Sequence, residues 1–178
     1  MRSETVARNY AEALFQLAER SGNTERYVEL LDAIAAAVEQ TPQVQAVLMS
    51  PKVPKPRKAQ ILAGAVREAP REFGLFLEAV VKRGRQHLLR EIATEYLKLL
   101  DQKLDRVRAG VTVARTPNER LKRTIQELLS KQLGKHVIPA FTVDPEILGG
   151  TIVRVGERVL DGSVRRRMTK LRRQLLSG

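Results

Sequence analysis

The chain has 178 residues, of which 43% are hydrophobic and 4% aromatic, and it contains no Trp and no Cys. This composition predicts a folded protein with an aliphatic core, and the lack of Cys excludes disulfides, thiolate zinc sites and cysteine nucleophiles. The N-terminal sequence has no apolar core of a secretory signal and the longest apolar run, residues 33–38, is too short to span a membrane, so we expect a cytoplasmic-side protein without direct membrane insertion. The net charge of +12 suggests an anionic partner. The excess of positive charge lies in the C-terminal part of the chain: residues 1–105 hold 16 Lys and Arg against 14 Asp and Glu, whereas residues 106–178 hold 16 against 6.

Hydrophobic residues recur at helical spacing through the first part of the chain. The helix predicted from Val6 to Leu17, with Ser3 placed as its cap, is expected to form a helical hairpin with the next predicted helix along the chain. The prolines of residues 50–56 indicate an exposed loop. The expected helices cover residues 6–17, 27–38, 44–49, 58–66, 72–81 and 88–104. Six helices joined by short turns predict an antiparallel bundle that ends near Asp105.

The first of these helices has a wider apolar arc than one contact with a core requires. The small and aromatic residues that widen it are Ala7, Ala11, Phe15 and Ala18. We therefore expect this helix to bury a second surface.

Beyond residue 105 the hydrophobic period changes from helical to alternating. Thr116 and Pro117 are placed as the cap and the first residue of a helix, and Gly134 as its end. The expected strands cover residues 109–114, 137–143, 151–155 and 159–160, and the expected helices cover 121–133 and 164–175. The predicted fold class is α plus α/β: a six-helix bundle over residues 1–105, followed by a small mixed α/β domain over residues 106–178.

The glycines around residue 150 do not match a phosphate-binding loop. Gly149, Gly150 and Gly156 fit neither G-x-x-x-x-G-K-[ST] nor a G-x-G-x-x-G that opens a helix after a strand. They are predicted to supply positive φ in turns between short strands. Asp161 and Gly162 are predicted to form the turn into the last helix.

Residues with the spacing of a catalytic or metal site are absent from the sequence. His87 and His136 lack the three or four convergent ligands that a metal site needs, and no serine lies in a Gly-x-Ser-x-Gly elbow. For Asp161 a turn or capping role is favoured over catalysis, because it needs only one local hydrogen bond. We expect no catalytic residue, no cofactor and no metal. No set of suitably spaced residues supports a hydrolase or transferase function.

The last predicted helix carries a cluster of basic residues, and Arg154 adds a further cation before it. The cluster consists of Arg165, Arg166, Arg167, Lys170, Arg172 and Arg173. A nucleic-acid interface is one interpretation, but Phe141 is the only aromatic residue in residues 106–178, so a base-stacking platform is missing. A solvated helix face explains these residues but not the size of the local excess of positive charge. A negatively charged protein partner explains both.

Two stretches resemble the delta subunit family of the F-type ATP synthase, which includes the mitochondrial oligomycin-sensitivity-conferring protein. They are residues 6–15 (VARNYAEALF) and residues 147–156 (ILGGTIVRVG), and the second continues through DGSV at 161–164 into the basic helix. Gly84 with the following Arg resembles a further turn of the family. The chain departs from residues frequent in the family at Asn9, Arg83 and Gln86.

The resemblance implies a non-catalytic stator subunit of the proton-translocating ATP synthase, peripheral at the cytoplasmic face of the cell membrane. It implies that the bundle receives N-terminal helices of alpha subunits, beside the beta subunits, in a groove between its first and fifth helices. The implied groove residues are Tyr10, Ala13, Leu14, Ala79, Val80 and Lys82. The C-terminal module would hold b-type peripheral stalk subunits, and no nucleic acid would bind. A basic nucleic-acid-binding domain is the alternative.

Overall fold

The computed structural model describes residues 2–66 and 68–176. Its contacts divide the chain into two compact units, Met1–Asp101 and Gln102–Gly178, which we name the helical unit and the mixed unit. The dividing point lies in the last turn of α6 (Leu89–Lys103), whereas the sequence predicts the boundary at residue 105, where the helical period ends. Among the described residues, no helix is both long enough and apolar enough to cross a membrane.

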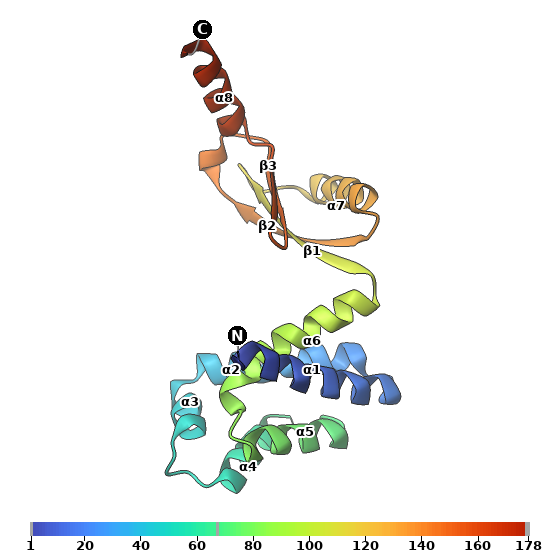
Figure 1. Ribbon diagram of the computed structural model, residues 1–178, viewed down its shortest axis with the longest axis vertical. Coiled ribbons are helices and arrows are strands. Elements are labelled where there is room, and N and C mark those ends of the chain that lie inside the picture. Colours follow the sequence, from blue (N-terminus) through green and yellow to red (C-terminus); the bar gives the residue numbers. More distant parts are fainter. Residues whose placement is uncertain (1, 67, 177–178) are drawn as a thin grey trace. The chain divides into compact units, whose positions relative to one another are not determined.

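The helical unit contains the six helices that the sequence predicts (Figure 1). They are α1 (Arg2–Ser21), α2 (Thr24–Gln40), α3 (Pro42–Met49), α4 (Lys55–Ala65), α5 (Arg71–Lys82) and α6, and the 3₁₀ turn η1 (Gln86–Leu88) precedes α6. All six helices start within four residues of the predicted ranges, and two starts change a predicted cap or loop. Ser3 lies inside α1 rather than at its cap. The helix α4 begins within the proline-rich loop, because Pro56 lies in its first turn, where no N–H donor is needed.

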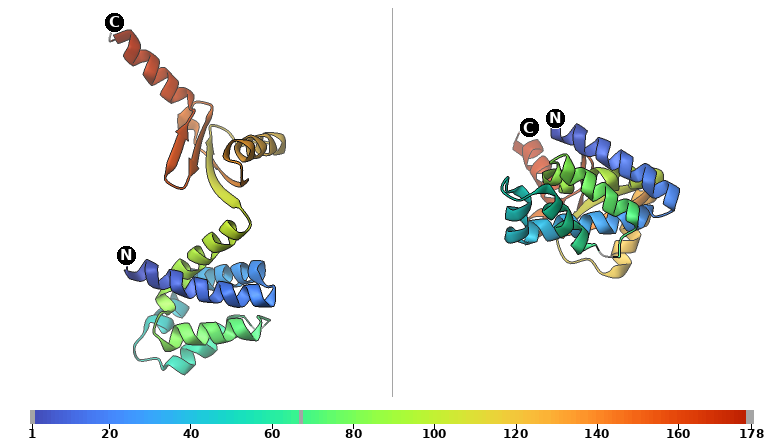
Figure 2. Two further views of the ribbon diagram at one scale, coloured as in Figure 1. Left: turned by 45° about the vertical axis from the view of Figure 1, so that its right-hand side comes forward. Right: turned by 90° about the horizontal axis from the view of Figure 1, so that it is seen from below.

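Aromatic side chains join three helices in the core of the helical unit. α1 lies beside α2 and also contacts α5 (Figure 2). Tyr27 of α2 and Phe73 of α5 are completely buried, and their rings meet edge to face with centroids 5.2 Å apart. The hydroxyl of Tyr96 on α6 donates to the carbonyl of Thr24 at 3.1 Å, and burial raises the pKa of Tyr96 above its ordinary value. These contacts hold α2, α5 and α6 together.

An exposed ion-pair cluster also connects α6 to α2. Arg90 Nε and Nη2 donate to the two carboxylate oxygens of Glu39 at 2.9 and 2.6 Å, and Nη1 donates to Asp32 at 2.7 Å. The hydrogen bonds from Arg90 hold the pKa of the Glu39 carboxyl below its usual range. Because exposed ion pairs contribute little to stability, the buried core remains the main support of the unit.

The mixed unit is built on a four-stranded sheet with the order β2-β1-β3-β4 (Figure 1). The strands are β1 (Arg106–Val113), β2 (His136–Val143), β3 (Thr151–Val155) and β4 (Arg158–Asp161). β1 is parallel to β2 and antiparallel to β3, and β3 is antiparallel to β4. A parallel pair needs a crossover connection, which α7 (Glu119–Leu133) supplies. The prediction of a mixed α/β domain is confirmed.

The helix α7 packs against one face of this sheet. Val111 of β1 and Val153 of β3 lie opposite each other and are buried together with Leu129 of α7. The backbone N–H of Val137 on β2 donates to the hydroxyl of Ser130 on α7 at 3.1 Å. Apolar packing and this hydrogen bond therefore fix α7 on this face of the sheet, where it contacts β2.

Side-chain caps begin both helices of the mixed unit. Asn118 accepts a hydrogen bond from the N–H of Leu121 at 2.8 Å and so caps α7. The prediction of Thr116 as this cap is wrong, because the chain is still extended at Asn118. The helix α8 (Val164–Leu176) follows Ser163, whose hydroxyl accepts from the N–H of Arg166 at 3.2 Å.

Candidate functional site

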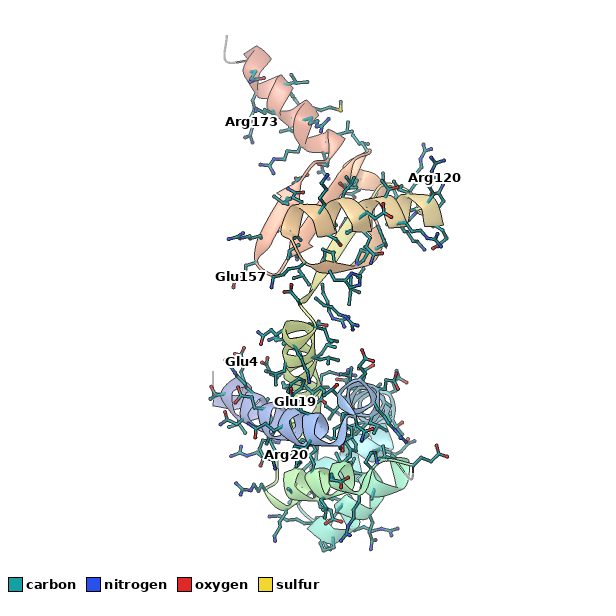
Figure 3. The ribbon with its side chains drawn as sticks, turned by 90° about the vertical axis from the view of Figure 1, so that its right-hand side faces the viewer. Glu4, Glu19, Arg20, Arg120, Glu157 and Arg173 are labelled. Carbon is teal, nitrogen blue, oxygen red and sulfur yellow. The ribbon has the colours of Figure 1, made fainter. Side chains whose placement is uncertain are left out.

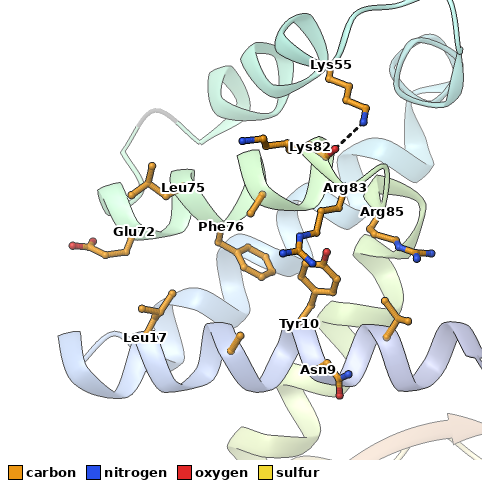
Figure 4. A pocket seen from close by; sticks show the side chains of 13 residues that line it. Asn9, Tyr10, Leu17, Lys55, Glu72, Leu75, Phe76, Lys82, Arg83 and Arg85 are labelled. Carbon is orange, nitrogen blue, oxygen red and sulfur yellow. Dashed lines mark hydrogen bonds between the residues drawn. The ribbon is translucent and has the colours of Figure 1, made fainter.

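An open groove of about 940 Å³ lies between α1 and α5 in the helical unit (Figure 4). At its floor the rings of Tyr10 on α1 and Phe76 on α5 meet edge to face, with centroids 6.2 Å apart. Leu75 is 54% exposed and Leu17 is 37% exposed, so two large apolar side chains of the groove are left to solvent. A hollowed apolar surface of this kind is typical of a protein interaction site.

Four of the six groove residues implied by the resemblance line this groove: Tyr10, Ala13, Ala79 and Lys82. The other two, Leu14 and Val80, require correction, because both side chains are completely buried in the core. Successive residues of a helix lie about 100° apart around its axis. Leu14 and Val80 are therefore turned inwards, whereas their neighbours Ala13 and Ala79 are exposed at the groove.

The groove also has charged ends that sequence reasoning misses. Arg83 and Arg85 line it just beyond the C-terminal end of α5, and Glu72 lines it in the first turn of α5 (Figure 4). Lys55 reaches across from α4 and donates to the backbone carbonyl of Lys82 at 2.8 Å. Arg83 and Arg85 lie in a turn without helical periodicity, so no regular pattern could have marked them as groove residues.

The basic cluster predicted for the last helix lies on α8, where every described side chain is exposed. Arg165 pairs with Glu146 at 3.2 Å, and Arg166 lies 4.0 Å from Asp161. Figure 3 shows Arg173 on α8, and Arg154 contributes its cation from a different element, β3. The other predicted members, Arg167, Lys170 and Arg172, also lie on α8.

An apolar stripe on α8 is exposed next to these cations. Val164, Met168 and Leu171 are 38%, 56% and 59% exposed. Leu175, the fourth apolar position predicted for this helix, has a side chain outside the described residues. The helix thus presents both apolar and cationic side chains to a partner.

A second groove, of about 660 Å³, lies between α7 and the β3–β4 hairpin of the mixed unit. Leu128 and Leu160 line it and are 62% and 51% exposed, and Arg166 lies at its edge. The sequence signal for this groove is the apolar stripe of α7, in which Leu129 is buried against the sheet while Leu128 remains exposed.

The turn residues near the start of α8 have distinct structural roles. Gly149, Gly150 and Gly156 have positive φ, as does Gly84 after α5. Gly162 does not, and its constraint is instead a close approach, because an added Cβ would lie 3.2 Å from the carbonyl oxygen of Thr151.

The carboxylate of Asp161 stabilises the turn that precedes α8. It accepts a hydrogen bond from the N–H of Ser163 at 3.0 Å. Hydrogen bonds from Ser163 and, to a smaller extent, the charge of Arg166 hold the pKa of Asp161 below its usual value. In the described part of the chain, no group of three or more His, Asp and Glu residues is arranged to hold a metal ion.

Comparisons with known proteins agree with this architecture. The profile of the family described as "ATP synthase delta (OSCP) subunit" matches residues 6–175. The protein "ATP synthase subunit delta" of Gemmatimonas aurantiaca is 43% identical over 176 residues, covering 98% of this chain and 95% of that protein. The protein of the same name from Desulforamulus reducens is 34% identical, covering 97% and 96%. A chain in the "Cryo-EM structure of Toxoplasma gondii mitochondrial ATP synthase hexamer" shares the fold, with a TM-score of 0.69, 21% identity, and coverage of 96% of this chain and 97% of that chain.

Proposed function

The chain belongs to the ATP synthase delta (OSCP) subunit family, and from this premise we propose that it is a non-catalytic stator subunit of a proton-translocating ATP synthase. The helical unit docks on the alpha and beta subunits of the catalytic head, and the mixed unit docks on b-type subunits of the peripheral stalk. The assembly lies at the cytoplasmic face of the cell membrane, and this chain is a peripheral part of it. By joining head to stalk, the chain keeps the head from turning with the rotor.

The groove between α1 and α5 carries the proposal. Its exposed leucines and its small residues Ala13 and Ala79 form a channel in which an apolar helix face can lie. The small residues that widen the apolar arc of α1 do not form the groove, because Ala7, Ala11 and Ala18 are completely buried in the core of the unit. The groove is instead lined by Tyr10 and Leu17 of the same helix. We assign the groove to the N-terminal helix of an alpha subunit.

The binding test uses the full chain and a peptide of about 25 residues that copies the N-terminus of the alpha subunit from the same organism. Ala13→Asp places an unpaired carboxylate in the apolar middle of the groove. We expect it to raise the Kd of the peptide roughly tenfold or more. Tyr10→Asp is expected to act in the same direction. Isothermal titration calorimetry measures both effects.

The matched control is Gln16→Asp, which introduces the same side chain at an exposed position of α1 outside the groove. It should leave the Kd unchanged within about twofold, because surface substitutions away from a binding site have small effects. If the unaltered chain releases no heat with the peptide, or if all three variants bind it equally, the assignment of this groove is wrong.

The cations of α8 support docking of the mixed unit on an acidic protein rather than on nucleic acid. Phe141, the one aromatic residue of this unit, packs against the core and offers no stacking surface. Exposed apolar residues such as Met168 lie among the cations and suit a protein helix better than a phosphate backbone.

We expect replacement of Arg167, Lys170 and Arg172 by Gln to weaken capture of the b-type subunit by this chain about tenfold or more at physiological salt. A pull-down with purified subunits measures this loss. Filter binding with single-stranded and double-stranded DNA and with RNA is the counter-test. Tight nucleic-acid binding that the three substitutions abolish, together with unchanged b-subunit capture, would favour the nucleic-acid alternative.

A further inference from the structure

The charged residues of the groove between α1 and α5 are distributed unequally along it. Glu72 lies at one end, in the first turn of α5, and Lys82, Arg83 and Arg85 lie at the other end (Figure 4). The two ends are separated by ten residues of α5, which is about 15 Å of helix. A docked helix therefore places about three of its turns between a carboxylate and a cluster of cations.

These three cations are available to a partner. Their side chains are exposed, and none of them pairs with a carboxylate within the described residues of this chain. Lys55, the fourth cation of the groove, differs because its ammonium group donates to the carbonyl of Lys82 at 2.8 Å. Lys55 thereby satisfies the last backbone carbonyl of α5. Among the described residues, the side chains of Arg83 and Arg85 have no hydrogen-bond acceptor.

We propose that Arg83 and Arg85 are specificity-determining residues that select a helix with carboxylates in the turn that lies against them. This inference rests on the proposed docking of an alpha-subunit helix in the groove. The apolar middle of the groove binds the apolar stripe of that helix. The cations fix the register of the helix, because a shift of the helix by one turn would move its carboxylates away from the two arginines. Arginine suits this role because its planar guanidinium can bind a carboxylate through two hydrogen bonds.

The electrostatic contribution has a measurable signature. Both arginines lie at the surface, where salt screens charges over about 8–10 Å at physiological ionic strength. Affinity for the alpha-subunit peptide should therefore fall as salt increases, and the part of the affinity that remains at high salt should come from the apolar groove.

The test measures binding of the same alpha-subunit peptide to the full chain at about 20 mM and about 300 mM salt. Replacing both arginines with Glu is expected to raise the Kd at least tenfold at low salt and to remove or reverse its salt dependence. Replacing both with Gln removes the positive charges without adding negative ones and is expected to raise the Kd by a smaller factor. Far-UV circular dichroism verifies that each variant is folded.

Arg120→Glu is the control, because it also makes the net charge more negative but lies on α7, a helix of the mixed unit (Figure 3). Peptides in which Glu and Asp residues are replaced singly by Lys then identify the contact. One of them should recover affinity for the Arg83→Glu, Arg85→Glu chain, which a purely structural role of these arginines would not produce.

Three outcomes would overturn the inference. The double variant could bind the peptide as tightly as Arg120→Glu, no Lys peptide could recover affinity, or a scrambled peptide of the same composition could bind equally well. A peptide that does not bind even the unaltered chain is a different result, because it contradicts the docking proposal itself.

Discussion

The Phe73→Ala variant is expected to lower the free energy of unfolding of the helical unit by about 3–5 kcal/mol. Phe73 is completely buried on α5, and its ring contacts Tyr27 at a centroid distance of 5.2 Å and lies 6.3 Å from the Phe76 ring. Removing it leaves a cavity where three aromatic side chains meet. Since small domains are stable by about 5–15 kcal/mol, the loss is a large fraction of the total.

Urea unfolding followed by tyrosine fluorescence measures this effect in the full chain. The chain has no Trp, and all three tyrosines, Tyr10, Tyr27 and Tyr96, belong to the helical unit, so the signal reports on that unit. The matched control is Leu75→Ala on the same helix, which removes a side chain that is 54% exposed. It should cost less than about 1 kcal/mol, yet weaken binding of the alpha-subunit peptide. Equal losses of stability in the two variants would contradict this description of the core.

The two substitutions also separate the core face of α5 from the face that lines the groove. The spacing of apolar residues is sufficient to predict six helices, because each helix has a long stripe of apolar residues. It does not show which apolar residues face the core of the unit and which face a partner. Phe73 and Leu75 lie about 200° apart around α5, so periodicity puts them on different faces, but it does not show that the face with Leu75 forms a groove with α1.

The same limitation explains the errors in the predicted groove. The resemblance points to α1 and α5, between which the groove lies, but Leu14 and Val80 are adjacent in sequence to residues of the groove and turned away from it in space. The cations Arg83 and Arg85, which sequence reasoning misses as groove residues, follow α5 in a turn, where neither the helical nor the strand period applies. Helix caps are missed for a related reason: the choice of Asn118 depends on whether one side chain reaches one N–H, which composition does not determine.

In the mixed unit, Gly150→Ala is expected to lower the free energy of unfolding by about 3 kcal/mol. Gly150 has a φ of +76°, which costs an alanine about 1–2 kcal/mol. An added Cβ would also collide with the carbonyl oxygen of Gly162 and lie 3.3 Å from the Cα of Ser163. Both neighbours are backbone atoms, so the collision cannot be relieved by rotating a side chain, and the start of α8 must move.

Gly156→Ala is the matched control, because Gly156 also has positive φ, +56°, but an added Cβ meets no described atom within 4 Å. It should cost only the conformational term, about 1 kcal/mol. Hydrogen exchange of the β1 and β3 amides measures both losses, and tyrosine fluorescence of the helical unit should not change. The difference between the two losses of free energy isolates the close approach between Gly150 and Gly162, which holds α8 to the sheet. There the N–H of Gly162 donates to the carbonyl of Thr151 at 2.9 Å. If both alanines cost the same, the approach contributes nothing, and α8 must be positioned by other contacts, such as those with η2 (Pro145–Ile147) and the hydrogen bond from the Val164 N–H to the carbonyl of Gly149.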